Sequence, residues 1–309
     1  MKFSVTIPAY KSRFLDEAIQ SVISQSYSDW ELIIVDDCSP EDIVSIVKPY
    51  LTDSRISYHR NKKNCGAVDV VDNWNICLSY CTGDYVICMG DDDRLLPCCL
   101  EEYATLISKY PLVTVLHAWT EIIDENGSLI AIQQPRTEWE SALSLIWNRW
   151  NSRKHQFIGD FCFKTQNLIE KGGYYKLPLA WGSDEITAVR AAMRHGIANT
   201  QKFCFQYRQN SLTITSSKNA RIKMQATLKE YEWFMNYLHG LDEKKLNDVD
   251  RNYYKTIMSI SKNRYKNIAQ NCIDDLHGNP FRLPYWYKNL KVFGFPKSFF
   301  LRCYLRSIF

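Results

Sequence analysis

Short apolar runs alternate with helical patterns in the first part of the chain, and this alternation limits the possible folds more than any other feature. The runs cover residues 3–7, 32–35, 56–58 and 85–89. Between them, apolar residues recur at helical spacing. A regular strand–helix alternation predicts an α/β fold with a mostly parallel, doubly wound sheet. Ser39 and Pro40 predict the start of one of these helices, with Ser39 as its cap.

The same alternation continues to about residue 207 and then changes. Asn126-Gly127 predicts a hairpin turn, because this pair tolerates positive φ. We expect a surface helix within 135–155 that could meet a substrate, and a helix that begins near Asp184 and stops at Gly196. Beyond about 218 the pattern is helical and polar. Further expected elements are helices at 98–109 and before 172–173, and strands at 112–119, from 158, and at 202–207.

Composition excludes several classes of protein. Hydrophobic residues make up 46% of the 309 residues, enough for a large core. A net charge of +4 gives no reason to expect nucleic-acid binding. Eleven cysteines without a C-x-x-C pair indicate free thiols in a reducing compartment. With no targeting segment expected before the first strand and no apolar run that could span a bilayer, the predicted location is cytoplasmic.

Acidic residues gather where two of the predicted strands end. Asp36 and Asp37 follow one run, and Asp91, Asp92 and Asp93 follow another. Ligands of parallel α/β sheets bind at the carboxyl ends of the strands. Carboxylate oxygens suit hard cations such as Mg²⁺ or Mn²⁺, which share their other positions with phosphates. The alternative for each acid is a polar strand end or a helix cap.

Three ordered motifs resemble those of a known family. They are VTIPAY at 5–10, LIIVDDCS at 32–39 and YVICMGDDD at 85–93, with Pro97 following. Together they resemble family 2 glycosyltransferases, which have the GT-A fold, over roughly residues 3–215. The resemblance implies a catalytic domain at 1–215, with its nucleotide-sugar half at 1–97 and its acceptor half at 98–215. A helical extension would occupy 216–309.

The resemblance also implies roles for individual residues near the donor. The positions that would hold the nucleobase, ribose or neighbouring donor groups are Pro8, Ala9, Tyr10, Asp37, Asn64 and Gly66. Asp91 to Asp93 match the motif that binds the metal, Mn²⁺ or Mg²⁺, and the diphosphate. We assign the metal to Asp91 and Asp93, with Asp91 and Asp92 also near the donor. The usual first Asp of that motif falls on Gly90 here.

A second match concerns the acceptor side. Residues 181–185, followed by Arg190, resemble the Glu-Asp motif of the family, with Ser183 in place of Glu. This makes Asp184 the candidate general base and Glu185 the second candidate; the alternative for Asp184 is a helix cap. Tyr207-Arg208, with Ser211 and Thr213 beyond, resembles a segment whose Arg pairs with the diphosphate, although a surface Arg is equally compatible.

The implied activity is an inverting, metal-dependent transfer of one sugar from a nucleotide sugar, UDP-linked by family habit, to a glycan or lipid-linked acceptor. Such enzymes build bacterial surface polysaccharides. A chain-extending synthase is disfavoured, because the Gln-x-x-Arg-Trp motif is missing after Asp184. The rival from another class is a non-catalytic nucleotide-sugar or glycan binder on the same fold. A third possibility, a sugar-1-phosphate nucleotidyltransferase, would need a Gly-rich basic loop after the first strand, and this sequence lacks such a loop. His117, His155 and His195 lack metal-ligand spacing and are expected to be structural.

The carboxyl-terminal tail has a charge of its own. Residues 281–309 contain six basic residues, ten aromatic residues and no acidic residue. This mixture suits the interface of an anionic membrane, so we expect peripheral contact with the inner face of the plasma membrane. The alternative is a terminal helix that packs its aromatic side chains on the body.

Overall fold

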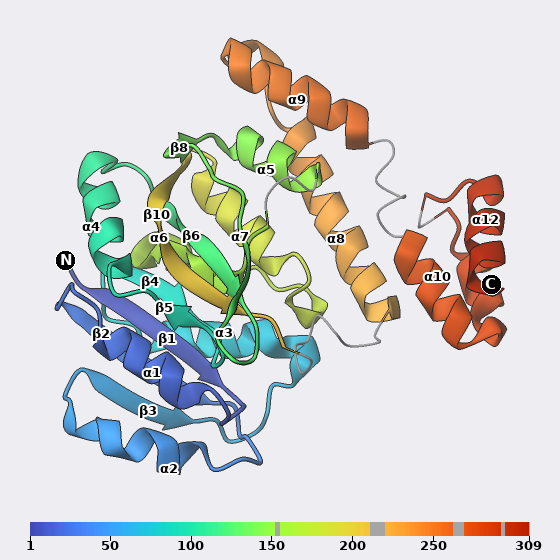
Figure 1. The fold of residues 1–309 in the computed structure, drawn as a ribbon. Helices are drawn as coiled ribbons and strands as arrows, with labels where there is room; N and C mark the ends of the chain where they lie inside the picture. Colours follow the sequence, from blue (N-terminus) through green and yellow to red (C-terminus); the bar gives the residue numbers. More distant parts are fainter. Residues whose placement is uncertain (152–154, 211–219, 262–268, 292–293, 309) are drawn as a thin grey trace.

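The computed structural model describes residues 1–151, 155–210, 220–261, 269–291 and 294–308 (Figure 1). Within these residues the strands form a sheet of ten. The strands are β1 (Phe3–Ala9), β2 (Trp30–Asp36), β3 (Ile56–Arg60), β4 (Tyr85–Cys88), β5 (Arg94–Leu95), β6 (Val115–Ile123), β7 (Leu129–Ile132), β8 (Trp139–Glu140), β9 (Phe161–Lys164) and β10 (Ile197–Arg208).

The sheet has a parallel half and a mixed half. Its main order is β3-β2-β1-β4-β9-β6-β10-β5. The first four strands of this order are parallel, as the alternation predicts. β9 then lies antiparallel between β4 and β6, and β10 returns parallel to β6. The carboxyl ends of β1, β2 and β4 therefore meet at one edge of the sheet. The hairpin predicted at Asn126-Gly127 joins β6 and β7.

The helices between the strands are α1 (Leu15–Ile23), α2 (Ile43–Val47), α3 (Val70–Ser79), α4 (Cys99–Lys109), α5 (Ala142–Trp150), α6 (Thr165–Glu170) and α7 (Ser183–Ala192). One predicted start is wrong. α2 begins at Ile43 and is capped by Asp42, whose Oδ1 accepts from the Ser45 N–H at 3.2 Å. Ser39 is engaged elsewhere, because its hydroxyl donates to the Tyr10 carbonyl at 2.6 Å.

Each face of the sheet is covered by its own helices. α1, α2 and α4 share one hydrophobic cluster with β1 and β2, while α3, α5, α6 and α7 share another with β4, β6 and β9. The prediction of a surface helix within 135–155 is wrong. α5 belongs to the second cluster, and its Leu145 and Ile146 side chains are completely buried.

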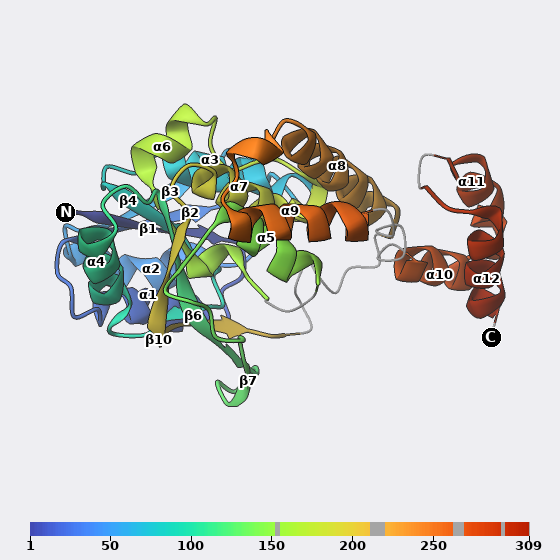
Figure 2. The same ribbon diagram turned by 90° about the horizontal axis from the view of Figure 1, so that it is seen from above.

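The carboxyl-terminal helices are α8 (Ala220–His239), α9 (Asp248–Ser261), α10 (Ala269–Gly278), α11 (Leu283–Lys288) and α12 (Lys297–Ile308). α8 and α9 contribute Phe234 and Ile257 to the core of the sheet domain. α10, α11 and α12 pack around a second cluster that contains Trp286 and Phe300 and also Met224 of α8. Figures 1 and 2 both show α10 between α8 and α12. No helix in the described ranges combines the length and apolarity needed to cross a membrane.

Candidate active site

The motifs that end β1 and β4 are in direct contact. Asp91 Oδ2 accepts from the backbone N–H groups of Tyr10 and Lys11, at 2.8 and 2.7 Å. Pro8 fits within β1 because the pairing with β4 ends at Thr6, so its missing N–H costs no ladder bond on that side. The structure therefore brings together the first and third predicted motifs.

The second motif joins the same edge through Asp37. Its backbone N–H donates to the Ala9 carbonyl at 2.9 Å. Its buried carboxylate accepts from the Asn61 amide at 2.8 Å and from the Cys65 N–H at 3.0 Å. Asp37 thus holds the loop that carries the predicted donor residues Asn64 and Gly66. Gly66 has φ of 76°, a conformation that favours glycine.

The three acids after β4 have different partners. Asp91 contacts the β1 turn, Asp92 Oδ2 accepts from the Asn210 amide at 2.7 Å, and Asp93 Oδ1 accepts from the Arg208 N–H at 2.9 Å. Burial, followed by the charge of Asp92, raises the pKa of Asp91 to about 6 and raises the pKa of Asp93 as well. The loop therefore concentrates negative charge that its own hydrogen bonds do not offset.

Gly90 explains how this loop fits a cation. A Cβ added at Gly90 would lie 2.8 Å from Asp93 Oδ2 and 2.9 Å from Asp92 Oδ1, so these two oxygens converge over the glycine. Carboxylate oxygens are the ligands that Mg²⁺ and Mn²⁺ prefer, and such ions leave positions for phosphates and water. The donor set fits a hard divalent cation. No group of three His, Cys, Asp or Glu is arranged to hold an ion within the described parts of the chain.

Arg208 has a different role from the predicted diphosphate contact. Its side chain is 1% exposed. Its guanidinium donates to the carbonyls of Asp92, Asp124 and Glu125 and to Glu17 Oε2, at 2.6 to 3.3 Å. These contacts use all three guanidinium nitrogens and hold the loop of residues 91–93 against β10 and the β6–β7 turn. Arg208 is therefore a positioning residue for the loop. Ser211 and Thr213 lie outside the described residues.

Asp184 stands in the first turn of α7. This helix begins after Gly182, which has φ of 88°, and no side chain caps it, so the predicted cap role of Asp184 is not observed. Asp184 is half-buried. Burial is the main cause that raises its pKa to about 6; the Arg149 charge opposes this, and the Glu185 and Asp160 charges add to it. A carboxylate with a pKa near neutrality is suited to accept a proton.

Glu185, the second candidate base, is paired. Its side chain is 4% exposed, and its Oε2 lies 3.3 Å from Arg149 Nε. This ion pair occupies the Glu185 carboxylate and leaves it less available to an incoming hydroxyl. This geometry favours Asp184 over Glu185 as the base.

Asp160, which the sequence did not single out, links the two sides of the site. It is completely buried in the turn before β9. Burial is the main cause that raises the pKa of Asp93 and that of Asp184, and the charge of Asp160 adds a smaller contribution to each. Asp160 therefore lies within electrostatic range of both the acidic loop and the candidate base. Only the antiparallel insertion of β9 between β4 and β6 places it there.

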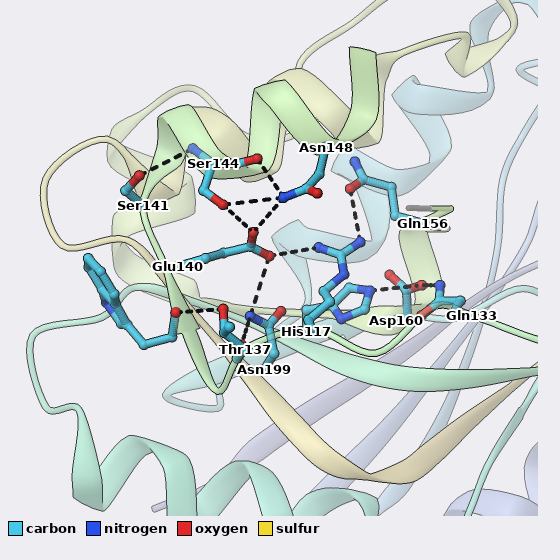
Figure 3. Close-up of polar contacts among 12 residues, drawn as sticks. His117, Gln133, Thr137, Glu140, Ser141, Ser144, Asn148, Gln156, Asp160 and Asn199 are labelled. Carbon is cyan, nitrogen blue, oxygen red and sulfur yellow. Dashed lines mark hydrogen bonds and ion pairs between the residues drawn. The ribbon is translucent and has the colours of Figure 1, made fainter. Parts of the chain in front are cut away.

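A buried polar network holds Asp160 (Figure 3). Asp160 Oδ2 accepts from the Gln133 amide at 2.6 Å and lies 3.3 Å from His117 Nε2. Burial lowers the pKa of His117, so its ring is neutral near pH 7. Next to it, buried Arg136 contacts Glu140 and Gln156, each at 3.4 Å. His117 is therefore a buried member of the network that surrounds Asp160.

The comparisons with known proteins identify the class of protein that this fold and site define. The profile of Glycosyl transferase family 2 matches residues 4–173, more than half of the chain. The chain belongs to this family. The match ends before Asp184 and Arg208, so the role of Asp184 stays a prediction.

Curated relatives and a solved structure agree with this family. The putative glycosyltransferase EpsE of Bacillus subtilis is 36% identical over 129 residues, 41% of this chain and 45% of that protein. The putative colanic acid biosynthesis glycosyl transferase WcaA of Escherichia coli is 40% identical over 114 residues, 36% and 39% of the two chains. The aligned region thus spans less than half the length of either relative. The structure of S. aureus TarS 1–349 superposes with a TM-score of 0.64, at 16% identity and with 100% and 88% coverage, which confirms the GT-A fold.

Proposed function

We propose that this chain is an inverting, metal-dependent glycosyltransferase that moves a single sugar from a nucleotide sugar to a glycan or a lipid-linked acceptor in cell-surface polysaccharide biosynthesis. The observation that carries the proposal is the meeting of the three motifs at one edge of the sheet, where Asp91 Oδ2 accepts from the Tyr10 N–H at 2.8 Å and the Asp37 N–H donates to the Ala9 carbonyl at 2.9 Å. An edge of this kind, at the carboxyl ends of parallel strands, is where a nucleotide sugar would bind.

The donor side rests on Asp37, Asp92 and Asp93. A nucleotide at the edge formed by β1, β2 and β4 would lie beside the Tyr10 turn and the loop that Asp37 holds. Asp93, one of the predicted ligands, and Asp92 would bind Mn²⁺ or Mg²⁺ through the oxygens that converge over Gly90. Asp92 would replace the other predicted ligand, Asp91, whose Oδ2 is engaged by the N–H groups of the β1 turn. Such a cation offsets the charge that develops on the departing diphosphate. A UDP-sugar is the favoured donor, because S. aureus TarS, which shares the fold, was solved with UDP-GlcNAc and with UDP.

The acceptor side rests on Asp184. A sugar hydroxyl is a weak nucleophile, so a carboxylate must take its proton as the new bond forms. Asp184 Oδ accepts that proton while the hydroxyl oxygen attacks the anomeric carbon and the bond to the diphosphate breaks. One base opposite one leaving group gives a single displacement, which inverts the anomeric configuration. We place the enzyme in the cytoplasm, with residues 281–309 in contact with the inner face of the membrane.

A donor screen tests this proposal. The full chain is mixed with UDP-, GDP- and dTDP-sugars, with and without Mn²⁺, and its melting temperature is measured. We expect stabilisation that requires both the cation and one class of nucleotide sugar, because ligands that bind the native state raise the melting temperature. NMR of the transferred sugar then gives its anomeric configuration. Absence of stabilisation by every pair contradicts the donor assignment, and a retained configuration contradicts the single displacement.

A further inference from the structure

The three terminal helices bury several of the aromatic side chains that the structure describes in the tail, whereas Phe281 and Tyr287 are exposed. Trp286, Phe295 and Phe300 are each at most 6% exposed, in a cluster with Cys272 and Cys303. Buried Asp275 accepts from the Trp286 indole at 2.9 Å and pairs with Arg282. The predicted membrane surface is therefore not made by these rings. It has to be sought among the side chains that the bundle leaves outside.

The outer face of α12 carries an apolar stripe. Leu301, Leu305 and Ile308 are 55%, 47% and 54% exposed. A helix turns by about 100° per residue, so positions i, i+4 and i+7 lie on one face. Phe300 and Cys303 point the opposite way, into the cluster. The helix α12 itself lies on the far side of α10 from α8 (Figures 1 and 2).

Cations border this stripe on the same helix. Arg302 and Arg306 follow Leu301 and Leu305 in the chain, and Lys297 begins the helix. All three are exposed, as are Lys288 and Lys291. None of these five forms an ion pair with an acid in the parts of the chain that the structure describes. An exposed apolar stripe next to unpaired cations is typical of helices that lie flat in an anionic lipid interface.

We infer that α12 is the membrane-contacting surface, with Leu301, Leu305 and Ile308 inserted among the acyl chains and Arg302 and Arg306 on anionic lipid headgroups. The single sign of charge favours a lipid surface over a protein partner, whose interface would offer charges of both signs. Near an anionic leaflet, each Lys or Arg side chain increases the binding of a protein to the membrane about fivefold. The inference narrows the peripheral contact proposed above to one helix face, and it does not depend on the donor or the acceptor.

Vesicle flotation of the full chain tests the inference. The probes are vesicles of phosphatidylcholine alone and of phosphatidylcholine mixed with phosphatidylglycerol. We expect flotation only with the mixed vesicles, and less of it at high salt. Leu301→Ser/Leu305→Ser/Ile308→Ser and Arg302→Glu/Arg306→Glu should each reduce the floated fraction at least tenfold. The control Leu112→Ser/Val249→Ser changes side chains that are 66% and 64% exposed elsewhere, and should float like the wild type.

Several outcomes would overturn the inference. One is that the wild type does not bind the mixed vesicles. Another is that the apolar variant floats as well as the wild type, which would mean that the cations alone bind the membrane and that the apolar stripe is not inserted. Loss of a dimer in the apolar variant, without any flotation of the wild type, would assign the stripe to a second copy of the chain. The melting temperature and donor-induced stabilisation of each variant are measured in parallel, so that a failure of folding or of the proposed activity is recognised separately.

Discussion

The raised pKa of Asp184 makes the stability of the folded protein depend on pH. Its pKa is raised from 3.8 to about 6 by burial above all. The unfolded chain therefore releases this proton at lower pH than the native chain. The native state loses stability as the pH rises between about 4 and 6, and the whole penalty is present above that window.

Asp184→Asn should therefore stabilise the protein at neutral pH. We expect its melting temperature to exceed that of the wild type by about 2–4 °C at pH 7.5 and the two values to converge toward pH 4. Thermal unfolding across this pH range measures the difference. The control is Asp248→Asn, because the Asp248 side chain is 94% exposed. A difference that does not vary with pH would contradict the raised pKa.

Gly90→Ala tests the cation site by steric means. The new Cβ would displace the oxygens of Asp92 and Asp93, which lie 2.9 and 2.8 Å from its position. We expect Mn²⁺-dependent donor affinity to fall at least tenfold in calorimetry, with a change in stability of about 1 kcal/mol or less. Gly240→Ala is the matched control, because its nearest contacts are 3.4 Å away. Unchanged donor affinity in Gly90→Ala would remove Asp92 and Asp93 from the donor site.

The sequence was enough to predict which residues gather at the ends of the parallel strands, but not which residues surround and position them. The acids at 91–93 and Asp37 follow apolar runs, and strand order in a parallel sheet brings such ends together. Asp160 could not be found in this way. It precedes a strand that enters the sheet from a distant part of the chain, and no local pattern marks that pairing. Arg208 was noticed, but its burial depends on packing that a motif does not encode.

At the end of β10, Arg208 holds the loop of residues 91–93 in place. Arg208→Met removes donors from three partly buried carbonyl groups and breaks the ion pair with Glu17, which costs about 2–3 kcal/mol. We expect this loss in the free energy of unfolding, measured in urea, together with weaker donor binding. Arg13→Met removes an exposed ion pair with Glu125 and should cost about 1 kcal/mol or less. Equal losses of unfolding free energy in the two variants would contradict this role of Arg208.

The elements themselves were predictable where periodicity is strong. The four parallel strands and the helices between them carry clear apolar patterns. The start of α2 was missed because Ser39 bonds to Tyr10, a contact with the neighbouring strand end that local capping rules omit. The burial of α5 was missed because α9 covers it, and Trp147 lies 5.4 Å from Tyr253 between ring centroids.

The carboxyl-terminal helices divide between two hydrophobic clusters. α9 and part of α8 complete the core of the sheet domain, whereas α10 to α12 form a second cluster to which α8 contributes Met224 and Leu228. The boundary predicted at 215 is tested by truncation. We expect residues 1–261 to fold cooperatively and to bind the donor, and residues 1–215 to be insoluble or molten, because Phe234, Leu238 and Ile257 would be missing from the core. Circular dichroism and thermal unfolding distinguish the two. A well-folded 1–215 fragment would support the predicted boundary and contradict this expectation.

The most direct test compares turnover with donor affinity in Asp184→Asn. If Asp184 takes the proton of the acceptor hydroxyl, release of nucleoside diphosphate should fall about 10²–10⁴-fold while the donor Kd stays nearly constant. Glu185→Gln, checked for folding, should retain more activity than Asp184→Asn. Turnover that survives in Asp184→Asn, or that falls only in parallel with donor affinity, would contradict the assignment of Asp184 as the base.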